Sequence, residues 1–275
     1  MNIVLICLGN FQEYIVTNLI QLIKTEHYNI HIVASKCILD HFEPFKDTMT
    51  IACADDLDDP FDFANKSQLD KEFRSGFWHY TSARMFVLHA YMKKKNLTWV
   101  VHLENDVLVY HNCTKILNYA NKRAIYMPFD TYQRNIASIM LVPDADILGK
   151  VLELYDFTKN DMQNFANKRG LVENLPICVS QPGMSDEQLW VSTKSHDDFI
   201  FDAAAMGQLV GGVDPRNIGG DTRGFVNETC VIKYNDYGTI VWIDKKPYYR
   251  LHNGNTVPIF NLHIHSKNLQ LYTIY

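Results

Sequence analysis

The chain has 275 residues, of which 47% are hydrophobic and 21% are charged, and its formal net charge is −5. This length is enough for one large α/β domain, and the composition excludes a disordered chain. The one basic cluster, Lys93-Lys94-Lys95, is typical of the solvated end of a helix. We therefore expect a globular protein that has no nucleic acid among its partners.

The N-terminal region and the cysteines indicate where the protein resides. The apolar run Ile3–Leu8 has no basic residues before it and is too short for a signal peptide or a membrane span. The six cysteines are scattered and form no Cys-x-x-Cys pair, which is typical of thiols in a reducing compartment. We expect a cytoplasmic protein without a membrane span.

The first third of the chain predicts a β-α-β opening. Ile3–Leu8 is expected to be a buried strand, the pattern from Tyr14 to about Lys24 has helical spacing, and Ile30–Ala34 is the next strand. Such an opening predicts a sheet that is parallel at its start. Gly9 stands alone after the first strand, so a dinucleotide-binding fold of the usual kind is not expected.

The remaining elements follow in order. Residues 40–75 are expected to be loops with a short strand near Met49–Cys53, and Phe77–Lys94 has the pattern of a long helix. Further strands are expected at Trp99–Leu103, Ala124–Pro128, Ser138–Val142, Thr239–Ile243 and Pro258–Ile264, with helices from Asp144 to Tyr155 and from Ser185. Asp161–Gln181 is expected to be irregular, and Gly207–Gly224 to be a glycine-rich loop of the kind that covers or shapes a site. No linker or repeat divides the chain, which predicts a single domain over residues 1–275.

A polar tripeptide, Glu104-Asn105-Asp106, ends the apolar run Trp99–Leu103, and a second apolar run, Val107–Tyr110, follows it directly. Carboxylates at the end of a buried strand are costly unless they are paired. In open α/β sheets ligands bind at the carboxyl ends of strands, and oxygen ligands there suit Mg²⁺ or Mn²⁺ shared with a phosphate. A polar turn that merely ends the strand is the alternative.

Arg84 lies within the apolar faces of the predicted helix Phe77–Lys94. A guanidinium in such a place needs an anionic partner. The partner is either a structural carboxylate or a diphosphate held beside Asp106, and the sequence leaves both open.

Near the C-terminus, polar and apolar residues alternate from Phe260 to Lys267, which places His263 and His265 on one face of a strand. Imidazole is a suitable ligand for Mn²⁺, and Lys267 would supply a positive charge for a phosphate. A polar strand face directed at water is the alternative, and the His-x-His-x-Lys grouping favours the functional interpretation.

Asp186 and Glu187 have two interpretations. Ser185 and Gln188 have the spacing of a capping box, and acidic residues in a first helical turn favour the helix dipole. Alternatively, one of the two carboxylates is a general base or an acceptor-binding group.

In this order, the pieces resemble GT-A glycosyltransferases of the glycogenin and bacterial lipopolysaccharide galactosyltransferase type. The resemblance is carried by the β-α-β start, Arg84 on its helix, the Glu104-x-Asp106 strand end, Asp186-Glu187-Gln188, and the C-terminal His with a following Lys. The run from Phe201 to Asn217 is also similar to sugar-transferase-like proteins of microbes and large viruses. The resemblance implies a mixed, mainly parallel Rossmann-type sheet flanked by helices, with a nucleotide-binding part at about 1–110 and an acceptor part at about 111–275.

The resemblance also implies roles for individual residues. Asp106 would bind Mn²⁺ or Mg²⁺, Glu104 would meet the metal or the ribose, and His263, with His265 as the alternative, would be the third ligand. The residues that would contact a nucleotide-sugar donor, with a UDP-sugar favoured, are Leu8, Gly9, Asn10, Arg84, Glu104, Asn105, Ser138 and Lys267. Asp186 or Glu187 would be the base of an inverting, hexosyltransferase-type reaction on a glycan or protein acceptor; in a retaining reaction this region would only position substrate.

Two departures from the family pattern stand out. Glu104 replaces the usual first Asp of the motif, and the Gly-x-x-Lys-Pro-Trp tail after the metal-binding His is absent.

Two alternative functions remain open on the sequence. A sugar-phosphate nucleotidyltransferase normally has a glycine-rich basic loop after its first strand, and Leu8–Tyr14 has neither the repeated glycine nor a basic residue. The second alternative is a non-catalytic protein of the same fold that binds a glycan or a nucleotide.

Overall fold

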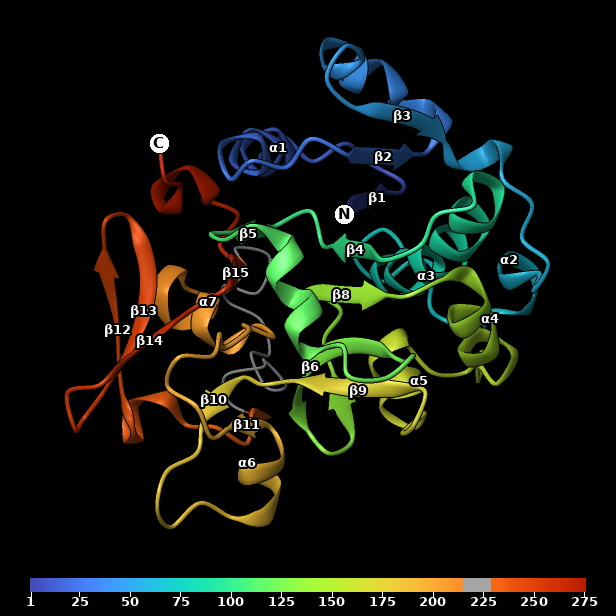
Figure 1. Cartoon of the computed structure of the whole chain (residues 1–275). Helices are drawn as coiled ribbons and strands as arrows, with labels where there is room; N and C mark the ends of the chain where they lie inside the picture. Colours follow the sequence, from blue (N-terminus) through green and yellow to red (C-terminus); the bar gives the residue numbers. More distant parts are fainter. Residues whose placement is uncertain (215–228) are drawn as a thin grey trace.

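The computed structural model describes residues 1–214 and 229–275, and an eight-stranded sheet runs through the middle of the molecule (Figure 1). The strand order is β3-β2-β1-β4-β8-β6-β7, and β9 pairs with β6. The strands are β1 (Asn2–Cys7), β2 (Ile30–Ala34), β3 (Thr50–Cys53), β4 (Val100–Leu103), β6 (Ile125–Thr131), β7 (Arg134–Asn135), β8 (Ile139–Val142) and β9 (Val172–Leu175).

The sheet is mixed. β1 lies between β2 and β4 and is parallel to both, so that Leu5 is opposite Ile32 on one side and Leu103 on the other. β2 is parallel to β3 and β6 to β9, whereas β8 is antiparallel to β4 and β6, and β7 to β6. The mixed, mainly parallel sheet flanked by helices confirms the fold class expected from the sequence.

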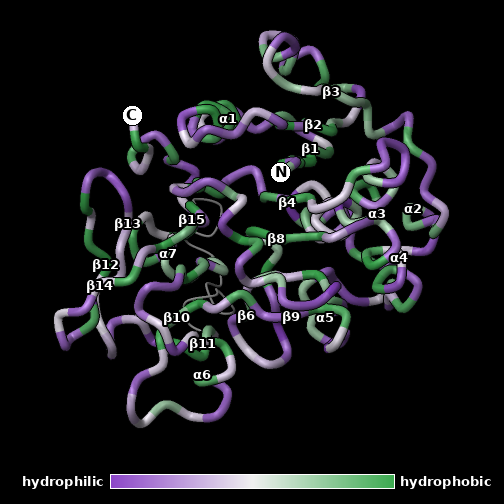
Figure 2. Tube along the Cα trace, viewed as in Figure 1, coloured by the Kyte–Doolittle hydropathy of each residue, from purple (hydrophilic) through white to green (hydrophobic). Residues whose placement is uncertain are grey.

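Both faces of this sheet are covered, which explains why its strands are continuous apolar runs. Ile3 and Leu5 pack into a core cluster with helix α1 (Tyr14–Lys24), whereas Val4 and Ile6 pack into the other with helix α3 (Phe77–Lys95). Figure 2 shows the apolar colour concentrated along the central strands and on the inner sides of the helices.

Most expected elements are confirmed. The expected helix at 77–94 is α3, the expected strand at 30–34 is β2, and Asp144 is the N-cap of α4 (Ala145–Glu153), accepting a hydrogen bond from the main-chain N of Ile147. The strands expected near 49–53, 124–128, 138–142 and 239–243 correspond to β3, β6, β8 and β12 (Gly238–Ile243). A short helix, α2 (Phe63–Lys66), lies within the expected loop region 40–75.

Three expectations about the C-terminal half were wrong. The segment expected to be irregular contains α5 (Asp161–Ala166) and β9. Helix α5 begins there because the Asn160 side chain caps it, accepting a hydrogen bond from the main-chain N of Gln163. The expected glycine-rich loop begins as helix α7 (Ala205–Gly211), and its part from residue 215 lies outside the described residues. The single strand expected at 258–264 is two, β14 (Thr256–Pro258) and β15 (Asn261–His263).

Smaller sheets complete the fold. β12, β13 (Lys246–Leu251) and β14 form an antiparallel sheet, and β10 (Cys178–Val179) pairs with β11 (Ser192–Thr193) beside α6 (Asp186–Trp190). β15 pairs with β5 (Val107–Val109), and α7 packs against β15 (Figure 1). No helix within the described ranges, including α3, has the length and apolar character that a bilayer crossing requires.

Helix α7 approaches the backbone of β15 closely at Gly207. A Cβ atom at position 207 would lie 1.9 Å from the carbonyl oxygen of His263. The buried Asp202 carboxylate joins the same two elements, because it accepts hydrogen bonds from the main-chain N atoms of Gly207 (2.8 Å) and His263 (2.9 Å). The position of His263 therefore depends on the absence of a side chain at residue 207.

We expect Gly207→Ala to lower the free energy of unfolding by about 3 kcal/mol, because the added methyl group forces α7 away from β15. Gly211→Ala in the same helix is the matched control: its Cβ would meet only side-chain atoms, the nearest being Ser266 Oγ at 3.2 Å. Urea denaturation of both variants measures the difference. Equal stabilities would contradict the close packing of α7 on β15.

Candidate functional site

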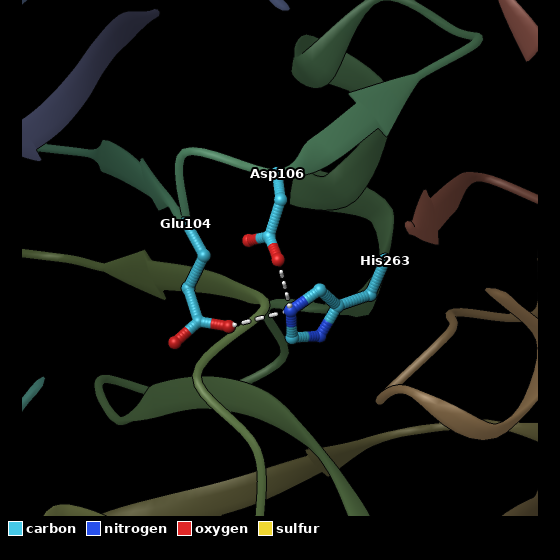
Figure 3. Close-up of side chains that lie close together, drawn as sticks. All are labelled: Glu104, Asp106 and His263. Carbon is cyan, nitrogen blue, oxygen red and sulfur yellow. Dashed lines mark ion pairs between the residues drawn. The ribbon is translucent and has the colours of Figure 1, made fainter. Parts of the chain in front are cut away.

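Three side chains that are distant in the sequence converge at the end of β4. Nε2 of His263 lies 3.1 Å from Glu104 Oε2 and 3.2 Å from Asp106 Oδ2 (Figure 3). One ligand atom from each of the three residues lies within 4.8 Å of the other two. All three side chains are largely shielded from water. A cluster of two carboxylates and one imidazole is thus present where the sequence places its acidic tripeptide.

The backbone brings the three residues together. Glu104 follows β4 and Asp106 precedes β5, and β15 is antiparallel to β5 with His263 opposite Val107. The main-chain N of Ile264 donates to the carbonyl of Asp106 (2.9 Å). Strand pairing therefore places the C-terminal histidine beside the acidic turn.

Helix α1 fixes the acidic turn from the other side. The fully buried Asn18 donates its side-chain N–H groups to the carbonyls of Glu104 (3.3 Å) and Asn105 (3.1 Å). Both carbonyls belong to the turn between β4 and β5, where the carbonyl of Glu104 also accepts a hydrogen bond from the main-chain N of Val107 (3.2 Å). Its amide therefore holds the peptides that carry both carboxylates.

The ring of His263 is oriented by a second contact. Its Nδ1 lies 2.9 Å from the carbonyl oxygen of Ala203. A carbonyl only accepts, so Nδ1 carries the proton and donates, and this directs Nε2 at the two carboxylates. A histidine that ligates a metal through Nε2 is oriented in the same way.

Charges balance within the cluster. Burial favours the neutral forms, but the positive charges of His263 and Lys267 hold the pKa of Asp106 well below its usual range. Burial likewise opposes the charged form of Glu104, and the positive charges of Arg84 and His263 together outweigh it, so the pKa of Glu104 is also lowered. Both carboxylates are therefore ionised at neutral pH and can accept a cation.

The donor set suits a small divalent ion. Two carboxylates and one imidazole are ligands that Mn²⁺ accepts, and Mg²⁺ is bound by the carboxylates alone in many sites. Burial lowers the pKa of His263, but the charges of Asp106 and Glu104 outweigh it and raise the pKa to about 9. A positive charge thus already sits at the point where a divalent ion would be bound.

The structure distinguishes the two candidate histidines. His263 belongs to the cluster, whereas His265 packs against its ring, with the ring centroids 4.2 Å apart. Burial and the charge of His263 lower the pKa of His265 well below its usual value. The interpretation of this strand as a polar face directed at water is wrong, because His263 is 6% exposed.

Arg84 has the structural partner that the sequence left open. Its Nη2 lies 2.5 Å from Glu104 Oε1 and 3.9 Å from Asp161 Oδ2. Lys267 forms an ion pair with Asp106. Each carboxylate of the acidic motif therefore has a cation beside it, and both cations also face the cavity described next.

A cavity of about 520 Å³ opens over the cluster. This volume is within the range of small-molecule sites. The predicted site residues that line it are Leu8, Asn10, Arg84, Glu104, Asn105, Asp106, His263, His265 and Lys267. The cavity therefore unites most of the residues that the sequence assigned to a donor and a metal.

Gly9 and Ser138 lie behind this lining. The main-chain N of Gly9 donates to Ser35 Oγ (3.2 Å), and a Cβ at Gly9 would lie 3.1 Å from the ring of Tyr80. The fully buried Ser138 donates to the carbonyl of Asp202 (2.7 Å). Both residues support the cavity wall, and their contact with a donor stays a prediction.

Asp186 and Glu187 are not brought to the cavity, whose lining includes neither. They open α6, where Ser185 and Gln188 form the expected capping box, and Glu187 accepts a hydrogen bond from the main-chain N of Tyr132. The structure thus gives both residues a local role, and their catalytic role stays a prediction.

The sequence analysis did not identify several residues of the cavity. Asp161 fell in a segment expected to be irregular, and the N-cap signal of Asn160 was its one available indication. The aromatic lining comes from the start of α1, from the start of α3 and from the residues just before α3, where the sequence pattern predicted helix packing or no role. These residues are Tyr14, Phe73, Phe77, Trp78 and Tyr80.

The sequence matches no family model and shows significant similarity to no curated protein. Solved structures to which the chain is similar include a xyloside xylosyltransferase 1 from mouse, in its apo form. The TM-score is 0.47 at 11% identity, over 70% of this chain and 94% of that one.

A second similar structure is the galactosyltransferase LgtC with donor and acceptor sugar analogues, with a TM-score of 0.44 at 12% identity over 65% of this chain and 75% of that one. A third is the inositol-1-phosphate CTP transferase from T. maritima, with a TM-score of 0.37 at 8% identity over 63% and 84%. Glycosyltransferases and nucleotidyltransferases are thus both among the similar structures. At these scores the similarity is partial, so the functional proposal rests on the site.

We expect His263→Gln to weaken Mn²⁺ binding by about 10-fold to 100-fold, because the substitution removes the imidazole from the cluster. His265→Gln, two residues away on the same strand, should change Mn²⁺ affinity less. Titration of each purified variant with Mn²⁺, followed by electron paramagnetic resonance of the free ion, measures both effects. A larger loss in the His265 variant would assign the ligand to His265.

Proposed function

We propose that the chain is a metal-dependent glycosyltransferase that moves a sugar from a nucleotide sugar, with a UDP-sugar favoured, to a glycan or protein acceptor. The proposal is carried by one observation: the Glu104, Asp106 and His263 cluster lies in a cavity whose lining also presents Arg84 and Lys267. A nucleoside diphosphate leaving group gains negative charge as it departs. Cations fixed beside it stabilise that charge more than they stabilise the bound substrate.

The donor set accepts Mn²⁺ or Mg²⁺, and such an ion would supply Lewis-acid stabilisation of the diphosphate. Glu104, Asp106 and His263 would hold it. Lys267 extends the positive charge from Asp106 toward the cavity, and Arg84 holds Glu104 in place. We assign the nucleotide to the part of the chain at about 1–110, because the lining residues Leu8, Asn10 and Asn105 belong to it.

In the proposed reaction the bond between the sugar anomeric carbon and the diphosphate breaks, and the acceptor oxygen forms a bond to that carbon. The acceptor proton passes to a base in an inverting reaction. Acceptor binding is assigned to the part at about 111–275. Four of the six cysteines are buried and all six are free, which supports the proposed cytoplasmic setting.

The sugar-phosphate nucleotidyltransferase alternative has less support from the site. Such an enzyme binds the triphosphate of its substrate with a glycine-rich basic loop after the first strand. Here that loop lines the cavity with Leu8, Asn10 and Gln12, none of which is basic. A non-catalytic protein that binds a nucleotide in this cavity is the second alternative, and turnover distinguishes it.

We expect UDP to bind in the presence of Mn²⁺ and to bind at least 10-fold more weakly in its absence, because the diphosphate and the carboxylates repel each other without the ion. Isothermal titration calorimetry of the chain with UDP, with and without Mn²⁺, measures this. Asp106→Ala should abolish the metal dependence. Metal-independent binding in the unmodified chain would refute the transferase proposal.

We propose Asp186 or Glu187 as the base of an inverting reaction. If one of them has this role, Asp186→Asn or Glu187→Gln should reduce the rate of UDP-sugar hydrolysis by about 10²-fold to 10⁴-fold while UDP affinity is retained. Lys194→Gln, on the loop after β11, is a control for surface changes near α6. Unchanged hydrolysis in both carboxylate variants would exclude them as bases.

A further inference from the structure

Asp161 is a buried carboxylate in the wall of the cavity. It is the first residue of α5, its side chain is 4% exposed, and it is among the residues that line the cavity. Its main-chain N donates to Ser82 Oγ of α3 (3.1 Å), which fixes its position beside that helix. This carboxylate is not one of the three residues of the metal cluster, and its charged partner is Arg84.

One of its two carboxylate oxygens has no partner. Oδ2 lies 3.9 Å from Nη2 of Arg84, whereas Oδ1 accepts no hydrogen bond from any part of the chain that the structure describes. A buried carboxylate oxygen without a donor is costly. Asp161 lines the cavity, so its carboxylate is placed where a bound molecule can donate a hydrogen bond to it.

Arg84 does not neutralise Asp161 completely. Its Nη2 is closer to Glu104, at 2.5 Å, than to Asp161, at 3.9 Å. Burial raises the pKa of Asp161 to about 6 and the charge of Arg84 opposes this, so the carboxylate is mainly ionised at neutral pH. The wall beside Asp161 therefore presents a negative charge and an acceptor to whatever occupies the cavity.

Three kinds of donor fragment could lie against this wall. A diphosphate is repelled by the carboxylate and is attracted to Lys267 and the metal cluster instead. A nucleobase suits the aromatic side chains of the lining, which include Tyr14 and Tyr80. A sugar has several hydroxyl donors, which match the carboxylate. It also has apolar C–H faces, which match the apolar lining residues Met162, Ile136 and Ala137.

We propose that Asp161 accepts hydrogen bonds from hydroxyl groups of the donor sugar and makes the site selective for neutral sugars over anionic ones. This inference rests on the proposed glycosyltransferase function. A sugar carboxylate would meet a like charge here. The cations of this part of the lining already have carboxylate partners, Arg84 with Glu104 and Arg134 with Asp130. Asp161 is thus a specificity-determining residue that contacts the substrate.

The first test uses the unmodified chain with Mn²⁺ and compares UDP-glucose with UDP-glucuronic acid, which differ in one carboxylate. Competition against UDP gives the two affinities. UDP-glucose should bind at least 10-fold more tightly, because the carboxylate of the second sugar is repelled. Equal binding, or tighter binding of UDP-glucuronic acid, would overturn the proposed selectivity.

The second test uses Asp161→Asn, which keeps the side-chain volume, with Asp146→Asn as the matched control. Asp146 lies in the first turn of α4, outside the cavity lining, and its side chain is 85% exposed. The probes are UDP and a panel of UDP-glucose, UDP-galactose, UDP-xylose and UDP-N-acetylglucosamine. The sugar that the unmodified chain binds most tightly is compared between variants.

In Asp161→Asn we expect UDP and Mn²⁺ affinities within about 2-fold of the unmodified chain, and an affinity for the UDP-sugar that is lower by about 10-fold or more. The preference for UDP-glucose over UDP-glucuronic acid should shrink in the same variant. Asp146→Asn should change none of these values.

The other outcomes have distinct meanings. If UDP and the UDP-sugar lose affinity equally, Asp161 acts only through Arg84 and the inference is wrong. If neither changes, a water molecule satisfies Oδ1 and the inference is also wrong. If the unmodified chain binds no UDP in the presence of Mn²⁺, the proposed function itself fails.

Discussion

The antiparallel pairing of β15 with β5 joins the C-terminal region to the acidic turn, and the candidate site depends on it. His263 is opposite Val107 in this pairing, so the histidine stands beside Asp106 although the two are 157 positions apart in the chain. The pairing in turn depends on α7, where Gly207 permits contact with the carbonyl of His263 and Asp202 binds its main-chain N. The main chain of His263, the proposed metal ligand, is therefore positioned by contacts that involve none of the proposed ligand atoms.

Charge balance explains how so many ionisable groups can be buried together. Glu104 and Asp106 would be costly at the end of a buried strand, but Arg84 is paired with the first and Lys267 with the second, and His263 lies between them. The same cations face the cavity, where a diphosphate would share them. The cations that stabilise the two carboxylates are thus the groups that the proposed reaction needs.

Asp161 extends this network away from the Glu104, Asp106 and His263 cluster. It lines the cavity and shares Arg84 with Glu104, and one of its oxygens accepts no hydrogen bond from the residues that the structure describes. A site organised in this way has a cationic end for a diphosphate and an anionic wall for hydroxyl groups.

The sequence by itself determined the elements whose pattern is local: the β-α-β opening, helix α3, the Asp144 cap and the acidic tripeptide after β4. Periodicity and capping depend on neighbours in the chain, so they can be recognised there. It could not show that His263 and not His265 joins the cluster, because this depends on the β15 register and on the contact with Ala203. Likewise only the tertiary structure placed Asp161 beside Arg84 and left Asp186 and Glu187 outside the cavity lining, since the packing of α5 and α6 is a long-range property.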